Sequence, residues 1–103
     1  MTLEEVCKNI YYAAHTAAAK AEAPVAYIRT KKSSDFPYSQ TELAETFAKL
    51  KWNTNLSSAD LTVEDDQSLP AGQLVITAVE EFMDDEGHAE ILQVHEEDSI
   101  INV

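Results

Sequence analysis

Hydrophobic residues recur at helical spacing from residue 3 to residue 22 and share one stripe when placed at about 100° per residue. Thr2 and Glu5 have the spacing of a capping box, in which each side chain bonds the other residue's backbone N–H. Pro24 lacks an amide donor and disfavours helical backbone at the residue before it. The pattern therefore predicts an amphipathic helix that begins after Thr2 and stops before Pro24.

The next segment, Val25 to Thr30, is rich in β-forming residues, and both of its alternating faces are largely apolar. An apolar character on both faces predicts a central strand. Residues 31 to 38 contain two serines and a proline, which predicts a loop.

A second capping box follows at Ser39 and Glu42. The apolar positions behind it fall in one narrow helical stripe and are Leu43, Phe47 and Leu50. The spacing predicts a second helix that ends near Trp52. We expect the Trp52 side chain to belong to the core.

Strand signals dominate the rest of the chain. Leu61 to Glu64 is a short candidate strand, whereas residues 73 to 83 fit either a helix, by apolar spacing, or a strand, by their β-branched run. A turn cluster with Gly87 separates that segment from an alternating run at residues 89 to 96, and this arrangement favours a β-hairpin. We expect Ile100 to Val103 to add an edge pairing or to dock as an apolar tail.

These elements predict an α+β fold in the order α-β-α-β-β-β. Two amphipathic helices pack on one face of a small, mostly antiparallel sheet of four strands. The length of 103 residues fits one domain that spans residues 1 to 103, and the 45% hydrophobic content is that of a globular chain.

Charge is distributed unevenly along the chain. The net charge is -12, and all seven Lys and Arg residues lie at or before Lys51. Residues 53 to 103 carry acidic side chains and no Lys or Arg. This balance argues against direct binding of nucleic acid or of an anionic membrane.

The acidic residues predict a surface that binds a protein with a basic surface, since opposite fields speed association. The expected partner-binding residues are Asp65, Asp66, Glu80, Glu81, Asp84, Asp85, Glu86, Glu90, Glu96 and Glu97. Small acidic inhibitors from phages, immunity proteins and proteins that mimic nucleic acid share this size and charge. A solvated face that only keeps the chain soluble is the competing interpretation.

Two other binding roles fit the sequence. Basic and aromatic residues at one end, which are Arg29, Lys31, Phe36 and Tyr38, predict a site for a small anionic ligand as an alternative. A homodimer or larger scaffold, formed through the hairpin edge or the tail at residues 100 to 103, is a further alternative.

Catalytic and metal-binding motifs are not found in the sequence. Cys7 lies on the apolar stripe of the first helix, which predicts a buried small hydrophobic residue. No Cys or His pair has zinc spacing, and the acidic run before Gly87 lacks the alternation of a calcium loop. We therefore expect no enzyme, no cofactor and no metal. A single cysteine, no signal peptide and no membrane span predict a cytoplasmic protein.

Overall fold

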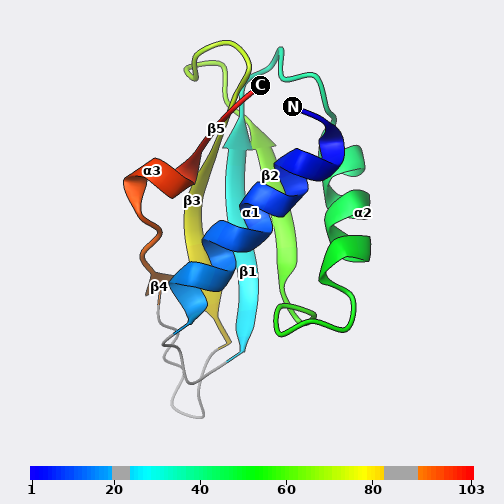
Figure 1. Cartoon of the computed structure of the whole chain (residues 1–103). Coiled ribbons are helices and arrows are strands. Elements are labelled where there is room, and N and C mark those ends of the chain that lie inside the picture. Colours follow the sequence, from blue (N-terminus) through cyan, green and yellow to red (C-terminus); the bar gives the residue numbers. More distant parts are fainter. Residues whose placement is uncertain (20–23, 83–90) are drawn as a thin grey trace.

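The structure, a computed structural model, describes residues 1–19, 24–82 and 91–103. It confirms the α+β class with two main helices and a mixed, mostly antiparallel sheet (Figure 1). The sheet has five strands, because residues 100–102 contribute a fifth strand to the expected four, while the predicted hairpin turn with Gly87 lies outside the described residues. The helices and strands are α1 (Leu3–Ala18), β1 (Val25–Lys32), α2 (Gln40–Lys51), β2 (Asp60–Asp65), β3 (Gln73–Glu81), β4 (Ile91–Leu92), α3 (Glu96–Ser99) and β5 (Ile100–Asn102).

Both long helices begin where their capping boxes predict. Thr2 and Ser39 each accept a hydrogen bond from the backbone N–H three residues later, and the Glu side chain there bonds the cap residue's own N–H. In α1 the helix ends at Ala18, and the expected extension to residue 22 runs into residues outside the described part of the chain.

Strand β1 is central, as predicted, although one of its two faces is exposed at Tyr27 and Arg29. It pairs in parallel with β2 and antiparallel with β3, so the sheet order is β2-β1-β3. Two short strands continue the sheet beyond β3: β4 pairs with Val79 and Glu80, and β5 pairs with Gln73 to Val75. Residues 73 to 81 are therefore a strand, and the tail from Ile100 adds an edge pairing.

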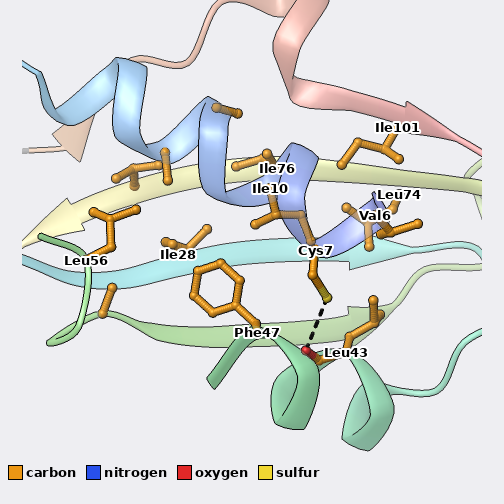
Figure 2. Close-up of a cluster of buried hydrophobic side chains, with 14 of the residues drawn as sticks. Val6, Cys7, Ile10, Ile28, Leu43, Phe47, Leu56, Leu74, Ile76 and Ile101 are labelled. Carbon is orange, nitrogen blue, oxygen red and sulfur yellow. Dashed lines mark hydrogen bonds between the residues drawn. The ribbon is translucent and has the colours of Figure 1, made fainter. Parts of the chain in front are cut away.

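Helices α1 and α2 lie on the same face of the sheet (Figure 1). Between these layers is one apolar core, in which Ile10 of α1, Phe47 of α2 and Ile28 of β1 are buried (Figure 2). On the opposite face Tyr27 and Arg29 of β1 are exposed. The fold is therefore two layers deep, and one face of the sheet is open to solvent at β1.

Trp52 does not belong to the core, and this expectation was wrong. Helix α2 ends at Lys51, and the backbone of Trp52 is extended with ψ 131°. Asn53 follows in the left-handed region with φ 59°. These two backbone changes turn the chain away from the apolar stripe of α2, and the indole is left 78% exposed.

Candidate functional site

Basic side chains of β1 lie between acidic side chains of its two neighbours. Arg29 donates to both carboxylate oxygens of Glu80 on β3, at 2.9 and 3.1 Å. Beyond the other edge of β1, Lys32 lies 2.7 Å from a carboxylate oxygen of Asp65, the last residue of β2. Lys31 lies 4.0 Å from a carboxylate oxygen of Asp66. The strand order therefore places Lys and Arg residues of the first half of the sequence beside carboxylates of residues 53 to 103, a half that contains no Lys or Arg.

Hydrogen bonds shift the pKa values of several of these groups. The hydrogen bond from Lys32 lowers the pKa of Asp65, and hydrogen bonds from Ser68 lower the pKa of Asp66. The hydrogen bond to Glu80 raises the pKa of Arg29. Three of the expected partner-binding carboxylates thus already have partners within the chain.

The fold separates the expected acidic residues into groups. Asp65 is in register with Lys32 at the C-terminal end of β1, whereas Glu81 is in register with Val25 at its N-terminal end. Glu96 and Glu97 lie on α3, beside the opposite edge of the sheet from β2. The remaining expected residues, Asp84, Asp85, Glu86 and Glu90, lie outside the described residues. The described carboxylates therefore do not form one continuous surface.

The four residues of the anionic-ligand alternative are also divided by the fold. Arg29 lies on the open face of the sheet and Lys31 is half-buried. Phe36 is only 5% exposed and belongs to the core. Tyr38 packs against the same core, and its hydroxyl donates to the backbone carbonyl of Met1 at 2.8 Å. No shared surface for one ligand is formed by these four side chains.

A groove lies where α1 approaches α3 and β5. Its volume is about 310 Å³. The lining combines aromatic, apolar and acidic side chains and consists of Met1, Asn9, Tyr12, Ala13, Thr16, Glu97, Asp98, Ile100, Ile101 and Asn102. Neither Glu97 nor Asp98 is in an ion pair with any of the described residues. This groove is the candidate functional site.

Tyr12 is the most exposed of the large hydrophobic side chains that line the groove, at 62%. Its ring forms a T-shaped contact with the ring of Tyr11, and the two ring centroids are 5.8 Å apart. Tyr11 in turn stacks on His15 and donates its hydroxyl to Asn55 at 3.2 Å. Asn55 completes this cluster through a 3.0 Å contact with the His15 ring nitrogen Nδ1. The exposed ring of Tyr12 is therefore connected to this cluster through its contact with Tyr11.

Sequence reasoning had already placed Glu97 in a binding surface but missed the groove itself. The groove depends on α3, a helix of one turn that contains Glu96, Glu97 and Asp98, and the sequence pattern does not predict this helix. The sequence pattern predicts a strand over residues 89 to 96 and assigns no element to Glu97 and Asp98, whereas the described part of that run has a strand only at Ile91–Leu92 and Glu96 begins α3. Tyr12 gave a usable signal, because its helical position places it outside the apolar stripe of α1.

Cys7 is fully buried, as predicted (Figure 2). Its Sγ lies 3.6 Å from the carbonyl oxygen of Leu43, which joins α1 to α2. Burial raises the pKa of Cys7 to about 11. A thiol that is both inaccessible and protonated at neutral pH is a packing group and not a nucleophile.

No family model matches the sequence, and no curated protein matches it. In structure the chain is similar to a nickel metallochaperone, HypA from Helicobacter pylori, solved in solution. The TM-score is 0.57 at 9% identity, and the match covers 100% of this chain and 94% of the other. At that identity the similarity concerns the fold alone.

Within residues 1–19, 24–82 and 91–103, no group of three or more His, Cys, Asp or Glu side chains is placed to hold a metal ion. In the same part of the chain, no helix is long and apolar enough to cross a membrane.

Proposed function

We propose that this chain is a small acidic protein-binding module that recognises a basic surface on its partner. The observation that carries the proposal is the groove between α1, α3 and β5, where Tyr12, Ile100 and two carboxylates line one hollow. Exposed aromatic side chains in pockets are typical anchors of protein interfaces.

The lining of the groove matches the chemistry of a lysine or arginine side chain. The face of an exposed tyrosine ring attracts a cation, and Glu97 and Asp98 supply opposite charge. Ile100, which is 39% exposed, offers apolar surface to the methylene stem of such a side chain. The volume of about 310 Å³ lies at the lower end of the range for small-molecule pockets, which suits a protruding side chain.

The net charge of -12 supports the same role at longer range. A field of one sign accelerates the approach of an oppositely charged partner and disfavours like-charged ones. Glu80, Asp65 and Asp66 are near cations of β1, whereas the carboxylates of α3 have no ion pair among the described residues. The carboxylates of α3 therefore contribute more to this field than the strand acids do.

An inhibitor or immunity protein is a specific form of this module, in which the bound basic surface is a partner's active site. A nucleic-acid mimic is more demanding, because it needs a row of free carboxylates at phosphate-like spacing. The internal ion pairs of Asp65, Asp66 and Glu80 weaken the mimic form. The inhibitor form needs only the groove and its acidic rim.

A pull-down from cell lysate with stepped salt tests the proposal. The immobilised chain retains a basic protein at low salt and releases it as screening increases. The substitution Glu97→Lys at the groove abolishes retention, whereas Glu45→Lys on α2, an equal change in charge at an exposed position, preserves it. Equal capture by both variants would contradict the proposal.

A further inference from the structure

Strand β2 forms one edge of the sheet. It pairs with β1 on one side, and no described strand pairs with its other side. Such an edge leaves alternate backbone N–H and C=O groups without a strand partner, and these groups can template an added strand.

The backbone groups that face the free edge can be identified from the bonds on the other side. The carbonyl of Thr62 accepts a hydrogen bond from the Thr30 hydroxyl of β1, and the N–H of Asp66 donates to the Lys32 carbonyl, each at 2.8 Å. Since successive residues of a strand point to opposite edges, the backbone groups of Leu61 and Val63 face away from β1.

A cation of this chain already uses the same edge. Ala59, just before β2, is in the outward-facing set by the same alternation, and the ammonium group of Lys51 donates to its carbonyl oxygen. The Lys51 ammonium also lies 3.7 Å from a carboxylate oxygen of Asp60. The start of the edge thus shows how a basic side chain is held there.

The side chains of β2 are acidic on one face of the sheet and apolar on the other at positions 60, 61, 63 and 64. On the open face of the sheet, Asp60 and Glu64 are exposed. On the helix-covered face, Leu61 and Val63 pack against the core yet remain only half-buried. An added strand would cover these two apolar side chains with its own apolar residues and place others beside the two carboxylates.

A second copy of this chain is a poor occupant of the edge. Antiparallel pairing of two β2 strands about Thr62 sets Asp60 of each copy opposite Glu64 of the other, and like charges directly opposite are destabilising. Two chains of net charge -12 also repel each other at a distance. A basic segment reverses the sign of both interactions.

We propose that the free edge of β2 binds an extended segment of a partner protein in which Lys or Arg alternates with apolar residues. The backbone of Leu61 and Val63 supplies the hydrogen bonds of strand addition, and Asp60 and Glu64 select basic side chains. This surface shares no residue with the groove, so it is a second binding site and not a refinement of the first.

A short capped peptide of alternating lysine and valine is a suitable probe with the full-length, isotope-labelled chain. Amide shifts in its nuclear magnetic resonance spectrum centre on residues 60 to 65 during titration, and hydrogen exchange slows at Leu61 and Val63. Glu64→Lys weakens binding about ten-fold, because an attractive pair becomes a repulsive one. Glu45→Lys, with the same change in net charge on α2, leaves it unchanged.

A second peptide, of the same sequence with every backbone amide methylated, separates strand addition from charge attraction. It keeps the lysines but has no backbone N–H to donate at either edge, and its methyl groups block close approach to β2, so it binds weakly if the proposal is right. Equal binding of both peptides, or no loss with Glu64→Lys, overturns the proposal. Shifts at Tyr12 and Glu97 in place of residues 60 to 65 also overturn it, while supporting the groove as the binding site.

Discussion

Arg29 and Glu80, which are 51 residues apart in the sequence, form a two-point ion pair across β1 and β3. The guanidinium group of Arg29 also lies 5.1 Å from the centroid of the Tyr27 ring. A planar fork of two donors on one carboxylate is the strongest geometry available to such a pair. The contact joins the half of the sequence that contains every Lys and Arg to the half, residues 53 to 103, that contains none.

A double-mutant cycle tests that contact. Arg29→Gln and Glu80→Gln each lower the free energy of unfolding, because each leaves a charged partner without its counterion. The double substitution is expected to cost less than the sum of the two single ones. Urea unfolding at low and high salt measures the coupling, which shrinks as salt rises. Strict additivity at low salt would show that the pair does not stabilise the fold.

Gly72 occupies a backbone conformation that only glycine adopts without strain. Its φ is +70°, and a Cβ atom added there would lie 3.1 Å from the carbonyl oxygen of Val103. Gly72→Ala therefore destabilises the chain by about 1 to 2 kcal/mol. Gly72→Asn costs less, because asparagine tolerates left-handed backbone better. Thermal unfolding ranks the three proteins, and an alanine variant as stable as the parent would refute the account.

Cys7 should resist thiol reagents until the chain unfolds. Its side chain is fully buried and its pKa is raised to about 11 by burial, so thiolate is scarce at pH 8. Labelling of the native chain is expected to be at least about a hundred-fold slower than labelling in denaturant. Absorbance from a chromogenic disulfide reagent follows both rates. Rapid labelling of the native chain would mean that α2 and the sheet do not cover this face of α1 in solution.

Asp35 links stability to acid pH. The hydroxyl of Ser33 at 2.7 Å and the backbone N–H of Gly72 at 3.2 Å lower the pKa of its carboxyl group. Because the folded-state pKa lies below the unfolded value, the unfolded chain binds more protons in acid. The contribution of Asp35 is present above about pH 4 and is lost as the pH falls through the lowered pKa.

The variant Asp35→Asn isolates that contribution from the titration of the other carboxyl groups. It is less stable than the parent at pH 7, and the difference between the two narrows as the pH drops below about 4. Urea unfolding over this pH range measures it. A constant difference at every pH would show that the carboxylate charge of Asp35 has no part in the effect.

Local signals predicted the fold class well. The two capping boxes predicted the starts of α1 and α2. The β-branched run within residues 73 to 83, together with the turn cluster and alternating run that follow it, correctly favoured strand β3 over a helix. Such signals depend on neighbours within a few residues, which is the range at which capping and side-chain alternation act.

Those local signals do not show which strands pair with each other or which distant side chains become neighbours. The parallel pairing of β1 with β2 has no local signature, yet it brings Lys32 beside Asp65 and divides the acids that the sequence grouped. The prediction that Trp52 belongs to the core failed, because the apolar stripe of α2 gives no sign that the backbone turns at Asn53. The groove depends on α3, a one-turn helix too short for periodicity to reveal.

The dissociation constant of the captured partner, measured for a small set of variants at low and high salt, tests the central claim most directly. The account predicts that Glu97→Lys and Tyr12→Ala each weaken binding by about ten-fold or more at low salt, whereas the control Glu45→Lys has little effect. It also predicts weaker binding of the parent chain at high salt. Equal losses for Glu97→Lys and Glu45→Lys, or an affinity that does not respond to Tyr12→Ala, would contradict binding at the groove.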